Sequence, residues 1–438
     1  MTHPCPQYSR RQLLGAVTAS SLVGLAGCSR LLGRIDDEDG MIIAWNERFV
    51  EAIQAFEGGN VGPVRWAALL NVAIYEAVNA ITAARDDPHY EAYTVDADRA
   101  PADGSRPAAV TGAAFTITER GYGQPFFAEV RDESFERAHE QDGDIRAGYE
   151  WGVDVAEEVL EGRPYDETFA TEPYDACPEE SNAPGCFRGT WLPEFAFVPP
   201  WTMEERTQFR PDGPPSLESD AYAEAWTEVY ELGRDREDRP SREVEQAAFW
   251  RSTRGSPRVP GMWNVIAQEV AAAEELPILE TARLFALLSM ALADAGISCW
   301  EAKYTYGFWR PRTAIWEADR DGNAGTTPDP DWEPISVGGS PEYSAGLATY
   351  SGVAGRILRE VIGRDEYPFE IGENLRTGFD AEETGVMRSF SGFEDAVTDA
   401  FESRIYLGNH FRFALEDGVA AGEDLAEWIM GSHLRAVE

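Results

Sequence analysis

The chain has 438 residues, 43% of them hydrophobic, and a formal net charge of -41. This length gives room for two or three packed domains, although large single domains also exist. Because neutralising phosphate groups requires a basic surface, so strong a negative charge argues against nucleic-acid binding. The acidic residues are spread along the whole chain, which suits a halophilic protein whose self-repulsion is screened by concentrated salt.

The first residues have the features of a targeting signal rather than of a folded element. The run SRRQLL at 9–14 is typical of a twin-arginine export signal, and the apolar stretch that follows is too short to span a bilayer. The sequence LAGC that ends at Cys28 resembles a lipobox, in which Cys28 would be lipidated; the alternative is a plain cleaved signal. We expect a signal over 1–27 and an acidic tether over 28–41. The protein would then be exported and anchored outside the cytoplasm as a lipoprotein.

The rest of the chain shows helical periodicity and no convincing strand alternation. Apolar residues recur at helical spacing in ten segments. These segments are 45–58, 61–81, 108–120, 143–162, 219–233, 241–251, 263–274, 279–304, 347–359 and 409–430. The most apolar of them, 279–304, contains Asp294, and its length and embedded carboxylate predict a central core helix rather than a membrane span. The sequence therefore predicts an all-α fold made of helical bundles.

A long irregular connection separates the first helices from the later ones. Residues 166–215 are rich in proline, glycine and aromatic residues, and such long loops in compact proteins are usually functional or interfacial. Cys177 and Cys186 lie within it, and an oxidising compartment favours a disulfide between them. We expect an N-terminal bundle with this connection over 42–215, and a C-terminal bundle with the functional site over 216–438.

Three segments of the C-terminal half contain the groups that an oxyanion needs. Lys303, the only lysine of the chain, precedes Arg310; a glycine- and serine-rich turn at 341–352 enters a helix; and Arg404 precedes His410. Arginine binds two oxygens in one plane, lysine supplies a compact point charge, and main-chain amides at a helix start bind another oxygen. A histidine can bond directly to a central phosphorus or vanadium atom. Alone, His410 would be interpreted as an ordinary core histidine; the cluster predicts an oxyanion site.

The pattern K-x6-R-P followed by S-R-x5-H resembles that of the vanadium-dependent haloperoxidases and the related acid phosphatases of the type-2 phosphatidate phosphatase superfamily. The segment WNERFVEAIQAFEGG and the runs after it are also similar to bacterial haloperoxidase-like proteins, over most of residues 42–436. The resemblance implies helical bundles of that type with a bound vanadate, or phosphate in the same site. It implies a small substrate, either peroxide with halide or a phosphoester, and membrane contact only through the lipid anchor. Such relatives are commonly homodimers.

The resemblance also implies roles for individual residues. Lys303, Arg310 and Arg404 would hold the equatorial oxygens of the anion. Gly346 would donate its main-chain N–H to it. His410 would coordinate vanadate in a peroxidase, or attack phosphorus in a phosphatase.

Two more residues receive roles on the same basis. Trp300, three positions before the lysine, would line the halide side. Asp294 would either balance one of the arginines or cap a buried turn. Both lie in the predicted core helix, which the resemblance therefore makes one wall of the site.

The middle motif departs from the family pattern P-S-G-H, because this chain has Ser-Ala-Gly-Leu at 344–347. Ala345 lacks the oxygen-binding hydroxyl, Leu347 replaces the acid–base histidine, and Ser340 stands where some members have an aromatic residue. General acid–base catalysis is typically worth roughly 100- to 10,000-fold, and leucine cannot supply it. Electrostatic stabilisation by the three cations would remain.

Three interpretations stay open at this point. The first is a haloperoxidase-like enzyme that oxidises halide with hydrogen peroxide, with activity weakened by Leu347. The second is a phosphatase with His410 as nucleophile and another acid, such as Glu342, as proton donor. The third is a non-catalytic lipoprotein that binds oxyanions.

Overall fold

The computed structural model describes most of the chain. The described residues are 40–56, 61–86, 88–138, 143–163, 177, 182–189, 191–252, 255–372 and 387–437. Cys28, the export signal and nearly all of the predicted tether lie outside these ranges, so the lipid anchor stays a prediction. Within them the fold is helical apart from one two-stranded sheet, which confirms the all-α fold class.

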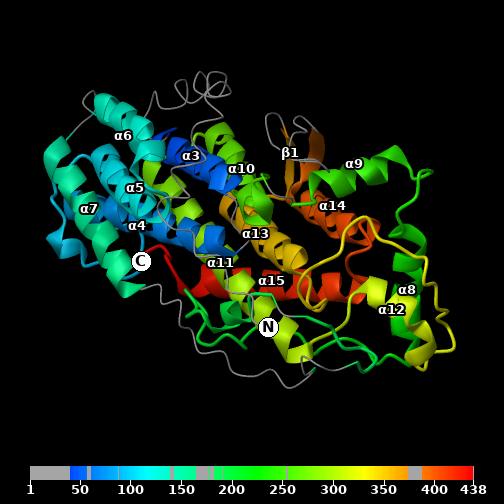
Figure 1. The fold of residues 1–438 in the computed structure, drawn as a ribbon. Helices are drawn as coiled ribbons and strands as arrows, with labels where there is room; N and C mark the ends of the chain where they lie inside the picture. Colours follow the sequence, from blue (N-terminus) through cyan, green and yellow to red (C-terminus); the bar gives the residue numbers. More distant parts are fainter. Residues whose placement is uncertain are drawn as a thin grey trace.

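The N-terminal helices pack together at one end of the molecule (Figure 1). They are α3 (Gly40–Phe56), α4 (Val61–Arg85), α5 (Arg106–Tyr122), α6 (Gln124–Ala138) and α7 (Ile145–Gly162). Side-chain caps start two of them, since Ser105 accepts a hydrogen bond from the main-chain N–H of Ala108 and Asp144 accepts one from Ala147. Helix α6 was not predicted, because its sequence is polar and its apolar periodicity is weak.

Helix α11 (Ile278–Tyr306) is the central element and carries Lys303 in its last turn. It packs against α4, α10 (Arg258–Ala273) and α13 (Gly346–Ile362), so it is apolar on nearly all sides. By length and composition α4 and α11 could each cross a membrane, but 89% and 94% of their most apolar windows are buried within the fold, as in core helices. Gly307 ends α11 in the left-handed conformation, with φ of 55°.

Further helices in the C-terminal half complete the fold. They are α8 (Asp220–Leu232), α9 (Ser241–Phe249), α12 (Pro311–Trp316), α14 (Phe393–Tyr406) and α15 (Arg412–Ser432), together with α10 and α13. Helices α8 and α12 lie at the opposite end from α3–α7 (Figure 1). A second buried cluster, which includes Trp309, Trp332 and Phe411, packs α8, α12 and α15 together. Members of this cluster precede and follow both Arg310 and His410 in the sequence, so the cluster fixes the main chain around these two residues.

The sheet and two helices differ from the sequence prediction. Strands β1 (Glu366–Ile371) and β2 (Arg388–Gly392) pair antiparallel, and Phe369 lies opposite Phe390. Pro368 within β1 hides the strand pattern, and the register shifts between Glu366 and Phe369 accommodate it. Helices α12 and α14 are likewise not predicted. Helix α12 is too short to show a periodic pattern, and α14 alternates acidic and apolar residues.

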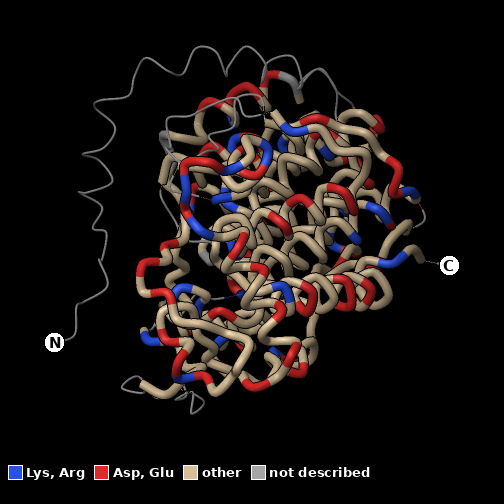
Figure 2. Tube along the Cα trace, turned by 90° about the vertical axis from the view of Figure 1, so that its right-hand side faces the viewer, with Lys and Arg blue, Asp and Glu red and all other residues tan. Residues whose placement is uncertain are grey.

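The described part of the long connection lies along α11. Its helix η2 (Pro193–Phe197) packs on α11, and the Cys177–Cys186 disulfide is present, which confirms that pairing. One large apolar cluster extends from Met41 to Leu434 and includes residues from both proposed bundles. The division into domains at residue 215 therefore stays a prediction. Figure 2 shows acidic residues distributed along many elements of the fold rather than in one tail.

Candidate functional site

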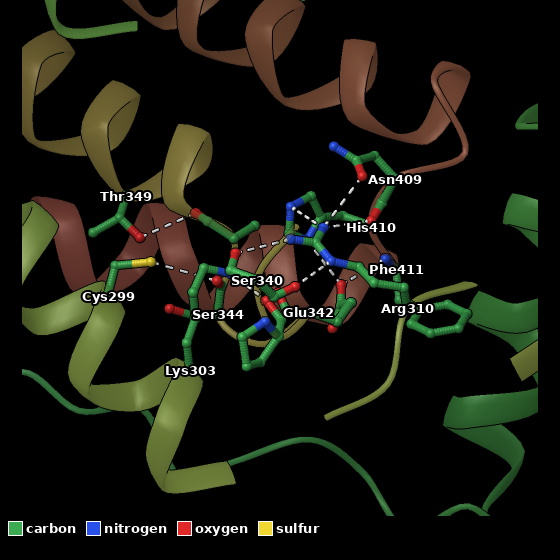
Figure 3. A network of polar contacts seen from close by, with 12 residues as sticks. Cys299, Lys303, Arg310, Ser340, Glu342, Ser344, Thr349, Asn409, His410 and Phe411 are labelled. Carbon is green, nitrogen blue, oxygen red and sulfur yellow. Dashed lines mark hydrogen bonds and ion pairs between the residues drawn. The ribbon is translucent and has the colours of Figure 1, made fainter. Parts of the chain in front are cut away.

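The fold brings the predicted oxyanion residues together from three separate segments. Lys303 ends α11, Arg310 directly precedes α12, Arg404 lies in the last turn of α14, and His410 lies in the loop between α14 and α15. The prediction that a helix covers His410 was wrong, since α15 begins at Arg412. All four side chains are buried. Lys303, Arg310 and His410 converge in the polar network of Figure 3.

Arg310 is held at three points. Its Nε donates to the carbonyl oxygen of Ser340 at 2.8 Å, and Nη1 donates to the carbonyl oxygen of Asn409 at 2.8 Å. Nη1 also lies 2.9 Å from Nε2 of His410. The guanidinium therefore ties the loop before α13 to the loop before α15, and burial lowers its pKa to about 10.

Gly338 makes room for this guanidinium. A Cβ at residue 338 would lie 2.7 Å from Nε of Arg310 and closer still to Cζ, whereas one at Gly339 would meet nothing within 4 Å. We expect Gly338→Ala to push Arg310 away from His410 and to weaken phosphate binding about tenfold, as loss of one charge-assisted contact would. Isothermal titration with phosphate measures this effect. Gly339→Ala is the matched control, and equal affinities in the two variants would contradict the proposed contact.

Lys303 is enclosed by main-chain oxygens. Its Nζ donates to the carbonyl oxygens of Pro341 at 2.6 Å and Glu342 at 3.1 Å. These bonds hold the loop before α13 against the end of α11. Burial, with repulsion from Arg310 as a smaller cause, lowers the pKa of Lys303 to about 8. A compact ammonium group fits between two carbonyls, whereas a planar guanidinium needs a wider acceptor arrangement.

Arg404 is held from the other side of the site. Its Nε donates to Oγ of Ser403 at 3.1 Å, and Nη2 donates to the carbonyl oxygen of Trp250. Trp250 is itself fixed by a 2.8 Å bond from its Nε1 to the carboxylate of Asp399. Burial, followed by repulsion from Arg310, lowers the pKa of Arg404 to about 9.

The three cations share an electrostatic property that ordinary buried residues rarely have. Among the residues that the structure describes, Lys303, Arg310 and Arg404 form no ion pair with a carboxylate. Buried charges are normally paired, because removing a charge from water is costly. Burial, followed by repulsion from Arg310, Lys303 and Arg404, also keeps the pKa of His410 well below its ordinary value. The site is therefore short of negative charge and complementary to an anion.

Glu342 is the carboxylate of this network, and it lies against the histidine. Its Oε1 is 2.9 Å from Nδ1 of His410 and accepts a 3.0 Å hydrogen bond from the main-chain N–H of Phe411. Its side chain is 0% exposed, and Oε2 has no hydrogen-bond partner among the described residues. Burial raises the pKa of Glu342 to about 7, against the pull of Arg310. In the phosphatase interpretation, Glu342 is expected to donate a proton to the leaving group. It lies instead at the Nδ1 edge of the ring, whereas a leaving group departs opposite Nε2.

The broken middle motif forms the start of α13. Ala345 occupies the N-cap without a side-chain hydrogen bond, and Gly346 is the first helical residue. The first amides of a helix have no acceptor within the helix, so they are suited to bind an anion. Leu347 is buried in the large apolar cluster together with Trp300. No proton-transferring side chain replaces the family histidine at position 347.

Trp300 and Asp294 lie at different positions along α11 and have different surroundings. Trp300 packs edge-on against Phe195 with ring centroids 5.4 Å apart, and its Nε1 is buried without a partner among the described residues. Asp294 accepts hydrogen bonds from the main-chain N–H groups of Trp201, Thr202 and Met203 at 2.6 to 3.1 Å. Of its two expected roles, Asp294 performs the capping role and pairs with no site arginine in the described structure.

Comparisons with known proteins agree with this arrangement. The family model described as the VCPO second helical-bundle domain matches residues 283–438, which include the whole cluster. Vanadium chloroperoxidase from Curvularia inaequalis is 27% identical over 215 residues, which are 38% of this chain and 34% of the relative. The chain thus matches about a third of the length of that curated relative.

Solved structures share the fold over nearly the whole molecule. A bacterial vanadium-dependent iodoperoxidase superposes with a TM-score of 0.72 at 24% identity, covering 91% of this chain and 97% of its own. A holo-form bacterial vanadium-dependent chloroperoxidase gives 0.62 at 16% identity, covering 86% and 96%. The likeness to these structures shows a shared fold, and residues 283–438 match the helical-bundle domain of the chloroperoxidase family model.

Proposed function

We propose that this protein binds vanadate at the cluster around His410 and uses it to oxidise halide with hydrogen peroxide. The observation that carries the proposal is the set of three buried cations, Lys303, Arg310 and Arg404, without carboxylate partners among the described residues. A tetrahedral oxyanion would satisfy all three, so the residues present fit vanadate and equally phosphate. The named activities of the similar proteins support the choice of vanadate.

Each residue has a role that follows from its contacts. Lys303, Arg310 and Arg404 would hold oxygens of the anion, Gly346 would donate its N–H, and Nε2 of His410 would bond to the central atom. Bound vanadate supplies a Lewis acid that activates peroxide toward halide. The buried cations would stabilise negative charge that develops on the oxygens. Because residue 347 is leucine, protons must be exchanged with solvent, and we expect a slower reaction than a histidine would allow.

The direct test is halide oxidation by the purified protein. With vanadate, peroxide and bromide, we expect bromination of a phenolic dye, and His410→Ala should reduce the rate by at least about 100-fold because the residue that would hold the vanadium atom is lost. His433→Ala is the matched control, since it removes a histidine outside the cluster. Equal rates in wild type and His410→Ala would sink the peroxidase proposal.

A phosphatase is the second candidate, and one observation favours it. His410 presents Nε2 beside Arg310 while a carboxylate holds its other nitrogen, as an activated nucleophile requires. Nε2 would form a bond to phosphorus as the bond to the leaving alkoxide breaks, and water would supply the proton to that alkoxide. Phosphomonoester hydrolysis without vanadate tests it, and a rate unaffected by His410→Ala would exclude it. Anion binding without either activity would leave the third interpretation, a non-catalytic oxyanion-binding lipoprotein.

We also propose that the protein works outside the cytoplasm and is held to the membrane by a lipid on Cys28. This proposal rests on the twin-arginine run and the lipobox-like sequence alone. Small substrates such as peroxide and halide would reach the site there from the surrounding medium.

A further inference from the structure

We propose that Glu342 is a positioning residue that holds His410 with its proton on Nδ1 and its Nε2 lone pair directed at the oxyanion site. The inference rests on the proposed function in that Nε2 is the atom that bonds the anion. Glu342 lies outside both matched motifs and outside the broken middle motif. It stands two residues before the broken Ser-Ala-Gly-Leu sequence, where its carboxylate enters the site from behind the histidine.

Two independent contacts determine the same tautomer. On one side, Nη1 of Arg310 lies 2.9 Å from Nε2, and a guanidinium can only donate, so Nε2 must accept. On the other side, Oε1 of Glu342 already accepts from the N–H of Phe411 and lies 2.9 Å from Nδ1, so Nδ1 must donate. A neutral ring with its proton on Nδ1 satisfies both sides at once.

The same arrangement prepares the ring for bonding. If the Nε2 lone pair bonds to vanadium or phosphorus, it would give up the hydrogen bond from Nη1 of Arg310, and the ring would become cationic while keeping its proton on Nδ1. The adjacent carboxylate stabilises that positive charge, while Lys303, Arg310 and Arg404 oppose it. Carboxylate partners of ligating histidines act in this way at metal sites, where their loss typically costs about 10- to 100-fold in affinity.

Anion affinity separates this role from a general charge effect. Phosphate affinity depends on the three cations, whereas vanadate affinity depends in addition on the bond to Nε2. Removing a negative charge in Glu342→Ala should not weaken phosphate binding, because it removes repulsion of the anion. We expect vanadate affinity to fall relative to phosphate affinity by about 10- to 100-fold in Glu342→Ala, with a smaller fall in Glu342→Gln. Titration calorimetry with the two anions gives this ratio, and an unchanged ratio in both variants would overturn the proposal.

Glu342→Gln is included because it nearly preserves shape and keeps an oxygen that can accept from Nδ1. If Glu342→Ala fails to fold, the Gln variant still distinguishes charge from hydrogen bonding. Glu76→Gln is the matched control, because Glu76 is another buried carboxylate that accepts main-chain hydrogen bonds, from residues 93 to 95 on another part of the fold. Its vanadate-to-phosphate ratio should equal that of wild type.

A spectroscopic readout tests the tautomer without any anion or activity. With ¹⁵N-labelled histidine, His410 should show a slowly exchanging proton coupled to Nδ1, identified by its absence in His410→Ala. This resonance should move in Glu342→Gln and vanish by exchange with water in Glu342→Ala. A proton on Nε2 in wild type would refute the proposal. If wild type binds neither anion, the proposed function fails, but this resonance still decides the role of Glu342.

Discussion

Leu347→His is expected to raise the rate of halide oxidation by about 100-fold, at the lower end of the range for general acid–base catalysis. Residue 347 is the second residue of α13 and follows Gly346, whose N–H is proposed to bind the anion. A histidine there would place a proton carrier beside the reacting oxygens. The lower end of the range is expected because the surrounding apolar cluster, which includes Trp300 and Tyr350, provides little to orient the ring.

The measurement is the turnover number for bromide oxidation at saturating vanadate and peroxide. Leu347→Gln is the control, since glutamine is polar and of similar length but transfers no proton. The histidine should cost about 1 to 3 kcal/mol of stability, because a polar ring would enter an apolar cluster. Equal turnover in the His and Gln variants would show that proton transfer does not limit the rate.

The second large effect concerns Lys303 and the pH dependence of stability. Burial lowers its pKa from 10.5 in the unfolded chain to about 8 in the folded protein. Between these values the unfolded chain binds a proton that the folded protein does not, so stability rises with pH. At 1.36 kcal/mol for each pKa unit, the free energy of unfolding should gain about 3 kcal/mol between pH 8 and pH 10.5. Protonating a buried amine costs stability, and raising the pH removes that cost.

Denaturant unfolding in a buffer free of oxyanions measures this gain. Lys303→Met has no such group to titrate, so the difference between the two proteins cancels the titration of Arg310 and Arg404. Saturating phosphate should flatten the wild-type curve, because a bound anion keeps Lys303 protonated. For the same reason phosphate affinity should fall as the pH rises above about 8. Parallel stability curves for wild type and Lys303→Met would contradict the buried, unpaired ammonium.

Sequence reasoning located the anion-binding half of the site because that half depends on residue types at short, fixed spacings. Lys303 and Arg310 are separated only by the end of α11 and its glycine cap, and Arg404 and His410 by the end of α14. Such local patterns can be recognised in the sequence without knowledge of the packing. The helical bundles were predictable for a related reason, since long amphipathic or apolar helices have strong periodicity.

The partners that tertiary packing provides are not predictable from the sequence. The bond between Glu342 and His410 joins residues 68 positions apart, and no local pattern indicates it. Asp294 binds a turn 91 to 93 positions earlier, so its capping role was one of two open choices. The space that Gly338 leaves for the Arg310 guanidinium cannot be predicted from the sequence either, because it depends on how closely the two segments approach each other.

The Cys177–Cys186 disulfide lies next to the bend that joins Lys303 and Arg310. Gly185 accepts from the N–H of Trp309, and the N–H of Phe187 donates to the carbonyl of Gly307, both at 2.8 Å. A Cβ at Gly307 would lie 2.9 Å from Cβ of Cys177. The cross-linked loop thus braces the short bend between Lys303 and Arg310 from outside. A link far outside the anion site therefore helps to fix the main chain on which two of its cations stand.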